Sequence, residues 1–348
     1  MANTNLASAK SAKNDEFYTQ YTDIQTEINA YLDYDPHVFR GKTVLLPCDD
    51  PEWSNFTKFF AQNFELLGLK KLISTSYAPE SKKFKGGYQL TLFESESPQF
   101  DAQKTQTHGK IFVLEHDVSG DQRIDINDLQ WQYLEGDGDF RSSEIRKLRD
   151  EADIIVTNPP FSLFREFVAW IADKKFIIIG HQNAITYKEI FPLIKANKIW
   201  LGKGFKGGAT HFHSYYTDYA TANDHIEGMI RVSGVVWFTN LEHGRRHDPL
   251  RLMTMKDVLK HSKHKDLREK KAFVRYDNYD AIEVPYTDAI PSDYEGVMGV
   301  PISFLEKYCP EQFEILGQMA NTNIDEYNFG YPFINKERKY ARILIRKK

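Results

Sequence analysis

The chain has few of the residues that mark secreted, metal-binding or membrane proteins. It contains only two cysteines, Cys48 and Cys309, in no metal-binding or redox spacing, which predicts a fold without disulfides in a reducing compartment. The longest apolar runs, such as Phe176 to Ile179, have the length of a strand and are too short to cross a membrane. The first residues are polar and do not resemble a secretory signal. We therefore expect a cytoplasmic protein without membrane contact.

Net charge excludes little, because the formal value is only -4. With 348 residues and 41% hydrophobic content, the chain can bury a full core and is long enough for two lobes. Residues 1–13 are small and polar with scattered lysines, which predicts a disordered arm. The remaining residues divide into two regions of different character.

The first region, residues 14–241, alternates between two hydrophobic periods. Helical spacing is seen around residues 24–31, 56–64, 161–168 and 187–196. Short apolar runs typical of strands occupy residues 43–46, 69–74, 110–114, 153–156, 176–180, 198–201 and 235–239. Strands that alternate with helices favour an α/β fold with a doubly wound, mainly parallel sheet.

The second region, residues 242–348, begins with an excess of positive charge. Residues 242–275 contain eleven Lys or Arg against five Asp or Glu, a local balance of +6, together with four histidines. One interpretation is a nucleic-acid-binding surface, in which Arg245 and Arg246 would contact phosphates. The alternative is that these lysine-rich helices are simply a solvated surface.

The stretch Asn158-Pro159-Pro160-Phe161 joins a predicted strand to a predicted helix. The two prolines predict a rigid loop at the carboxyl end of the strand, where open α/β sheets bind ligands. The side-chain carbonyl of Asn158 and the backbone carbonyl of Pro159 could accept both hydrogens of an exocyclic amine, and Phe161 offers a stacking face. An amine held in this way has its lone pair drawn out of conjugation and becomes a nucleophile. Alternatively, Asn158 only caps the helix and Phe161 is ordinary core.

The predicted strand 43–46 is followed by a second polar loop that carries Asp49 and Asp50. This position suits the amino group or the ribose hydroxyls of a cofactor. Because the loop lacks glycines to cradle phosphates, a sulfonium donor fits better than a dinucleotide. The alternative is that this segment only caps the next helix, through Asp50 or Ser54.

A third loop, Gly136-Asp137-Gly138-Asp139-Phe140, offers a carboxylate beside an aromatic ring. Asp139 could accept a hydrogen bond from an adenine amino group while Phe140 packs against the ring. As an isolated motif it is weak, because such sequences usually form only a turn, or less often a cation-binding loop.

These segments together resemble the EcoRI-type adenine-specific DNA methyltransferases. The resemblance extends from about Asp15 to the C-terminus, and its carriers are DEFYTQY (15–21), CDDP with SNF (48–56), LGLKKLI (67–73), GDGDFRSSE (136–144), VTNPPFSLFREF (156–167), ITYKEIFPLI (185–194), WFTNL (237–241), YDNYDAIEV (276–284) and MGVPISFL (298–305). The family implies an S-adenosylmethionine-dependent methyltransferase sheet, residues 14–241, with a C-terminal target-recognition or DNA-binding region, residues 242–348.

The resemblance also implies roles for individual residues. The residues that match the family's cofactor site are Phe17, Tyr18, Thr19, Asp49, Asp50, Pro51, Asp139, Phe140 and Asn158, and those that match its catalytic loop are Asn158, Pro159, Pro160 and Phe161. Trp237 or Phe238 is a candidate contact to the displaced base, with a core strand as the alternative. The strand 69–74 ends without an acid, so ribose recognition is unassigned.

The implied function is site-specific N6-methylation of adenine in double-stranded DNA. S-adenosylmethionine would supply the methyl group, and the adenine would be rotated out of the duplex. We expect a monomer from a restriction-modification or orphan modification system, without direct contact to any cognate endonuclease. One rival is a methyltransferase that modifies glutamine in proteins or adenine in RNA; the basic C-terminal region argues against a protein substrate. Another is a DNA-binding module without catalysis, which the intact residues 158–161 oppose.

Overall fold

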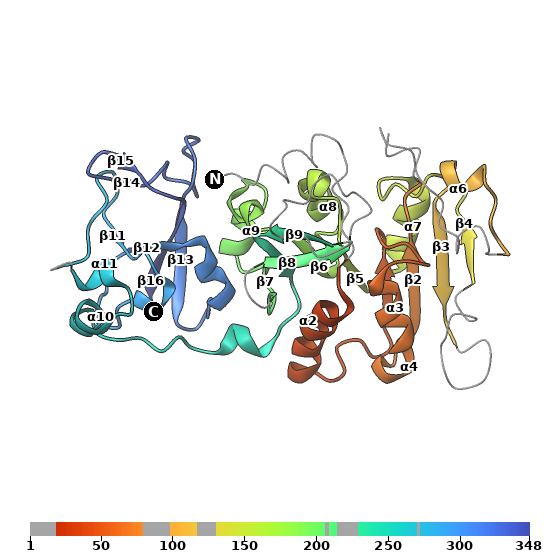
Figure 1. Ribbon diagram of the computed structural model, residues 1–348, viewed down its shortest axis with the longest axis horizontal. Coiled ribbons are helices and arrows are strands. Elements are labelled where there is room, and N and C mark those ends of the chain that lie inside the picture. The colour runs from red at the N-terminus through yellow and green to blue at the C-terminus, as the bar shows by residue number, and fades with distance from the viewer. Residues whose placement is uncertain (1–18, 79–97, 117–129, 206–208, 214–228, 270–271) are drawn as a thin grey trace. The chain divides into compact units, whose positions relative to one another are not determined.

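The computed structural model describes residues 19–78, 98–116, 130–205, 209–213, 229–269 and 272–348 (Figure 1). The predicted disordered arm, residues 1–13, lies outside these ranges. The chain divides into two compact units, which consist of residues 1–181 with 202–241 and residues 182–201 with 242–348. The expected division into a methyltransferase domain, residues 14–241, and a target-recognition region, residues 242–348, stays a prediction. No helix in the described ranges is long and apolar enough to cross a membrane.

A mostly parallel sheet forms the centre of the first unit. Its strands follow the order β4-β3-β2-β1-β5-β6-β10. Their bounds are Thr43–Leu46 (β1), Lys71–Thr75 (β2), Lys110–Leu114 (β3), Trp131–Tyr133 (β4), Ile154–Thr157 (β5), Lys175–His181 (β6) and Val235–Thr239 (β10). The neighbours β2, β1, β5 and β6 are parallel, whereas β3 and β10 run antiparallel to β2 and β6. The predicted α/β class is confirmed, and the sheet is compatible with a methyltransferase fold.

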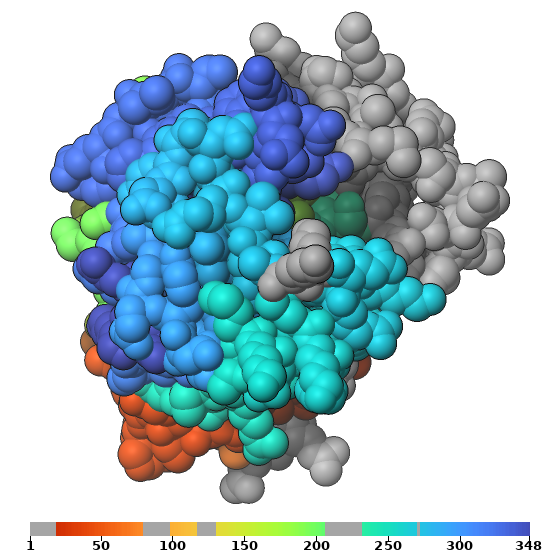
Figure 2. Space-filling model, turned by 90° about the vertical axis from the view of Figure 1, so that its left-hand side faces the viewer, coloured from red at the N-terminus to blue at the C-terminus, as the bar shows by residue number. Residues whose placement is uncertain are grey.

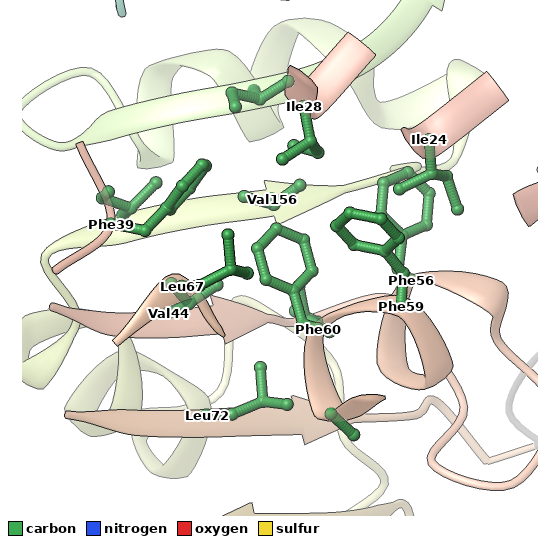
Figure 3. Close-up of a cluster of buried hydrophobic side chains, with 14 of the residues drawn as sticks. Ile24, Ile28, Phe39, Val44, Phe56, Phe59, Phe60, Leu67, Leu72 and Val156 are labelled. Atoms are coloured by element: carbon green, nitrogen blue, oxygen red, sulfur yellow. The ribbon is translucent and has the colours of Figure 1, made fainter. Parts of the chain in front are cut away.

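Helices cover one face of this sheet through a cluster of aromatic and aliphatic side chains. They are α2 (Tyr21–Tyr34), α3 (Asn55–Gln62) and α4 (Phe64–Leu67). Ile28 of α2 and Phe60 of α3 are fully buried against Val44 and Val156, which belong to adjacent strands (Figure 3). The sequence predicted one helix over residues 56–64. The structure has two, because α3 ends at Gln62 and α4 starts at Phe64.

The opposite face is covered by α7 (Ser143–Glu151) and α8 (Phe164–Trp170). The Phe164 ring packs against Phe238 with ring centroids 5.1 Å apart. It also lies over Gly180, where an added Cβ would be 2.4 Å from the ring, so only glycine permits this approach. Burial on both faces explains why these strands are continuous apolar runs in the sequence. Shorter elements of this unit are α6 (Lys104–Thr107), η2 (Phe161–Leu163) and the antiparallel pair β8 (Ala209–His213) and β9 (Met229–Ser233).

The second unit contains a sheet that the sequence analysis did not predict. Its order is β11-β12-β16-β13, and a separate hairpin pairs β14 with β15. The strands are β11 (Ile282–Glu283), β12 (Met298–Pro301), β13 (Phe313–Met319), β14 (Phe333–Ile334), β15 (Glu337–Arg338) and β16 (Arg342–Lys347). The helices are α9 (Phe191–Lys195), α10 (Met255–His261) and α11 (Lys265–Arg268), with 3₁₀ turns η3 (Gln182–Thr186), η5 (Gly244–His247), η6 (Thr287–Ala289) and η7 (Ile302–Lys307).

Residues 182–201 join this second unit, although the sequence analysis placed them in the methyltransferase domain. The Arg246 guanidinium lies over the Trp200 ring at 3.7 Å, and Gln318 donates a hydrogen bond to the Thr186 carbonyl at 3.3 Å. These contacts bind the segment to C-terminal residues that are distant in sequence. Of the predicted strand 198–201, only Trp200–Leu201 forms a strand, β7.

Part of the YDNYD motif has a structural role in this unit. The Asp277 carboxylate accepts hydrogen bonds from the backbone N–H groups of Asn335 and Lys336 at 3.1 and 2.6 Å. These two residues have positive φ angles of 52° and 63° in the turn between β14 and β15. Asp277 therefore stabilises a turn conformation that few residues adopt.

Candidate active site

The carboxyl ends of β1, β2 and β5 bring together three of the predicted loops. Because these strands are parallel neighbours, their ends lie at one edge of the sheet. The Asp49 N–H donates to the Thr75 carbonyl at 3.0 Å, and the Thr75 hydroxyl donates to the Pro47 carbonyl at 3.2 Å. The chain order reverses between β1 and β5, and this is the position where open α/β sheets bind ligands.

The Asn-Pro-Pro-Phe segment connects β5 to a short 3₁₀ turn and then to α8. Asn158 directly follows the last strand residue and is half-buried, and Pro160 accepts a hydrogen bond from the Leu163 N–H at 3.0 Å. The predicted arrangement of strand, loop and helix is therefore present. Phe161 is 9% exposed and belongs to the hydrophobic cluster of α2 and α3, so the ring contributes to the core as well as to the edge of the loop.

Both carboxylate oxygens of Asp49 accept hydrogen bonds inside the protein. The Ser54 hydroxyl donates to Oδ1 at 2.6 Å, and the Thr157 hydroxyl donates to Oδ2 at 2.5 Å. Asp49 is 4% exposed, and Ser54 also caps α3 by accepting from the Phe56 N–H at 3.0 Å. The cap that the sequence left open for Asp50 or Ser54 is therefore made by Ser54.

Asp50 and Glu52 form an acidic pair beside a buried lysine. Asp50 Oδ1 accepts from the Glu52 N–H at 2.9 Å, which orders the loop after β1. Lys110 is 5% exposed, and its Nζ lies 2.5 Å from Glu52 Oε2 and 3.9 Å from Asp50 Oδ2. Burial raises the pKa of the Glu52 carboxyl above its usual value, and the Lys110 ammonium only partly offsets this effect. The Trp131 ring, 4.7 Å from Lys110 Nζ, closes the cluster.

Thr19 lies at the N-terminal end of α3, the end that Ser54 caps. Its backbone carbonyl accepts a hydrogen bond from Asn55 Nδ2 at 2.8 Å, and the residue is 3% exposed. The Thr19 hydroxyl is buried and has no hydrogen-bond partner among the described residues. A buried hydroxyl in this situation costs free energy unless a ligand satisfies it, so the site fits a polar cofactor. Phe17 and Tyr18, the other predicted residues of this segment, lie outside the described ranges.

The loop of residues 136–140 lies against the end of β2. Gly138 has a φ of 80°, and a Cβ there would be 2.0 Å from the Ser76 carbonyl oxygen. The Ala78 N–H donates to the Asp137 carbonyl at 2.8 Å. The glycine therefore permits a close approach between two loops at the edge where we expect the cofactor.

Within that loop, Asp139 and Phe140 already have protein partners. Burial alone would raise the pKa of the Asp139 carboxyl, but hydrogen bonds from Arg141 outweigh it and lower the pKa. Phe140 is 5% exposed and makes edge contacts with Phe167 and Trp170 at 5.1 and 5.4 Å. Their contacts to a cofactor adenine stay a prediction.

Trp237 and Phe238 lie inside the first unit. Trp237 is 1% exposed and packs against Phe56 and Phe205, and Phe238 is fully buried beside Phe164. Both rings are therefore internal to the unit. The structure therefore favours the core-strand alternative for both.

Arg246 differs from the expected phosphate contact. It is 4% exposed, stacks on Trp200 and hydrogen-bonds to Asn197 Oδ1, so its side chain is an internal element of the second unit. Arg245 is partly exposed and stays a candidate. The sequence alone did not separate these adjacent arginines, because burial of one depends on Trp200, which is distant in the chain.

Several polar residues at this edge of the sheet were not predicted from the sequence. They are Ser54 as a partner of Asp49 and, without any proposed role, Glu52, Thr57, Ser74, Lys110 and Thr157. Thr157 could have been noticed, because a hydroxyl residue directly precedes Asn158 at the end of an apolar strand. Lys110 gave no such signal, because its place beside Glu52 depends on the antiparallel pairing of β3 with β2.

Comparisons with known proteins identify the family. The family model described as adenine-specific methyltransferase EcoRI matches residues 5–348. The chain is 41% identical to the type II methyltransferase M.EcoRI of Escherichia coli, over 99% of this chain and 96% of that protein. It is 33% identical to the type II methyltransferase M.MpnI of Mycoplasma pneumoniae, over 98% and 97% of the two chains. No solved structure is significantly similar. The chain belongs to the EcoRI family of adenine-specific methyltransferases.

Proposed function

We propose that this protein methylates the N6 amino group of adenine at specific sites in double-stranded DNA. The relatives are type II methyltransferases, and the family is adenine-specific. One observation carries the assignment to particular residues. The Asn-Pro-Pro-Phe loop and the Asp49–Ser54 loop share one edge of the sheet and are joined by the Thr157–Asp49 hydrogen bond. This arrangement supports a methyl-acceptor loop at residues 158–161 beside a methyl-donor loop at residues 49–54.

The first unit would hold S-adenosylmethionine at the ends of β1 and β2. When bound, this cofactor supplies an electrophilic methyl group on a sulfonium. The hydroxyl of Thr19 and the carboxylate of Asp50 are polar groups suited to it, and Pro51, which follows Asp50, is buried. Family resemblance adds Phe17, Tyr18, Asp139 and Phe140 to this set.

Asn158 would act on the target base without removing a proton first. Its side-chain oxygen and the Pro159 carbonyl accept the two amino hydrogens of adenine, which directs the nitrogen lone pair toward the methyl group. The Phe161 ring supports the base by stacking at the edge of the loop. The proton on the methylated nitrogen leaves after transfer. Because adenine's amino group cannot reach this edge while it is paired, the base must rotate out of the duplex.

Rotation of the base predicts tighter binding to mispaired targets. Unpairing costs a few kcal/mol and least for a mismatch, so a duplex with a mispaired target adenine should bind about 10-fold or more tightly than the paired duplex. Equilibrium titration of fluorescently labelled duplexes measures the difference. Equal affinities, combined with an unchanged 2-aminopurine signal at the target position, would count against rotation.

Long-read sequencing tests the activity directly. DNA from cells that express the protein should carry N6-methyladenine within one short sequence motif, and cells with Asn158→Ala should not. A purified protein that transfers label from S-adenosylmethionine only to RNA or protein would support the rival methyltransferase. A protein that binds DNA but never binds the cofactor would support a DNA-binding module.

A further inference from the structure

A buried polar network surrounds Asp49 and includes Ser54, Thr57, Ser74 and Thr157. Besides the two hydrogen bonds to its carboxylate, the Asp49 carbonyl accepts from the Ser74 hydroxyl at 2.6 Å, and Ser74 is 2.7 Å from the Thr57 hydroxyl. All five residues are at most 4% exposed. A satisfied network of this kind fixes the positions of its members, because each displaced group would lose a partner in a medium of low dielectric.

The Thr157–Asp49 bond lies where the sheet itself no longer joins β1 and β5. The ladder between these strands pairs Val44 with Ile154 and Leu45 with Ile155, and it ends there. By contrast, the ladder of β1 with β2 continues to Leu46 and Ser74, and that of β5 with β6 continues to Thr157. Backbone pairing therefore positions each loop relative to its outer neighbour. It does not position the two loops relative to each other.

We infer that Asp49 is a positioning residue that holds the methyl-donor loop in register with the methyl-acceptor loop. Oδ1 fixes the start of α3 through Ser54, and Oδ2 fixes the end of β5 through Thr157, one residue before Asn158. Transfer requires the amine and the methyl carbon to be aligned, and a displacement of about 1 Å can slow such a reaction about 100-fold. The inference rests on the proposed function. It assigns the Asp49 carboxylate to positioning, in place of the direct contact with the cofactor that the family resemblance implies.

The matched pair Thr157→Val and Thr157→Ser tests this inference. Valine keeps the shape of threonine and removes the hydroxyl, whereas serine keeps the hydroxyl. We expect Thr157→Val to slow single-turnover methylation of DNA about 10- to 100-fold at saturating cofactor, since alignment and not affinity is lost. The dissociation constant of S-adenosylhomocysteine, measured by calorimetry, should stay near that of the parent. Thr157→Ser should restore most of the rate.

Thr239→Val is the control for stability. Thr239 is fully buried in the same sheet, and its hydroxyl donates to the Phe176 carbonyl at 2.8 Å near the opposite edge. It should lower the melting temperature at least as much as Thr157→Val without slowing transfer. A purely structural role for Thr157 predicts instead that the methylation rates of both variants fall in line with their melting temperatures.

A double-mutant cycle isolates the bond itself. If Asp49 and Thr157 act through their shared hydrogen bond, Asp49→Asn combined with Thr157→Val should be no slower than Asp49→Asn alone. Independent, multiplying effects would overturn the inference, as would Thr157→Val at the parent rate. In both cases the proposed function stands as long as the parent protein methylates adenine. A parent that methylates no adenine would overturn the proposed function and this inference with it.

Discussion

Replacing Asn158 with alanine should slow methyl transfer by about 10²- to 10³-fold, the usual loss when one aligned hydrogen-bonding group is removed from a reacting centre. The reason is specific to its position. Asn158 follows β5 directly and is half-buried at the edge where the proposed donor and acceptor loops meet. Its removal takes away one of two acceptors for the adenine amino group and leaves the Pro159 carbonyl alone. Single-turnover methylation with saturating cofactor measures the effect.

The melting temperature of Asn158→Ala distinguishes a role in methyl transfer from helix capping. The turn after the loop begins at Phe161, and no side chain caps it in the described structure. We therefore expect the melting temperature of Asn158→Ala to stay close to the parent's. Asn240→Ala is a suitable control, because Asn240 bonds to the backbone of Phe176 and Lys174 near the opposite edge of the sheet. That variant should lose stability and keep its rate once folded.

Phe161 should behave differently from Asn158. Because its ring is 9% exposed and lies in the core cluster, Phe161→Ala should cost stability, up to about 3–5 kcal/mol, as well as weaken stacking of the base. Phe161→Tyr keeps a flat ring and should retain much of the stability and much of the base stacking. If Asn158→Ala methylated adenine near the parent rate, the catalytic role of this loop would be wrong, whatever happened at Phe161.

Removing three cations from α10 and α11 should lower DNA affinity by about 10²- to 10³-fold at 0.1 M salt, because each cation that contacts a phosphate releases counterions and so strengthens binding. Each lost contact should also reduce the slope of log affinity against log salt by about 0.9. The variant is Lys256→Gln, Lys260→Gln and Arg268→Gln. All three side chains are exposed, and none forms an ion pair with another described residue. Figure 2 shows the teal and cyan atoms of this segment at the surface of the second unit.

Cations that already have acidic partners provide the control. Lys263 lies 2.8 Å from Asp288, and Arg275 lies 2.6 Å from Asp280. Neutralising this pair of cations should change affinity far less than the triple variant does. Binding titrations at several salt concentrations give both the affinity and the slope. An unchanged slope for the triple variant would move the DNA-binding surface away from these helices. Arg246, being internal, would report on folding instead.

Local sequence determined the central strands and the Asn-Pro-Pro-Phe loop. The run of residues 43–46 is β1 as predicted, and residues 235–239 are β10, because β-branched and aromatic runs buried on both faces leave a clear signal. Two prolines after an apolar strand likewise fixed the loop at residues 158–161. The ends of helices were less well predicted, because Asn63 interrupts what the spacing shows as one helix.

The sheet of the second unit could not be predicted from the sequence. In β16, three buried residues are flanked by arginines and a lysine, so its composition resembles a basic tail. In β13, a register shift between Ile315 and Gly317 breaks the alternation on which strand prediction depends. β16 pairs with β12 on one side and with β13 on the other, and it is this pairing that gives β13 and β16 a buried face.

The roles of individual polar residues were decided by tertiary structure. The sequence places two aspartates after β1, but it does not show that Asp49 turns inward to two hydroxyls while Asp50 faces Lys110. It places two arginines side by side, but it does not show that contacts with Trp200 and Asn197 make Arg246 internal. Residue type and local period fix which strands form and where a loop must lie, since both depend on neighbouring residues. Which side chain is exposed at that loop depends on partners that the fold brings from more than a hundred residues away, as Thr157 is brought to Asp49.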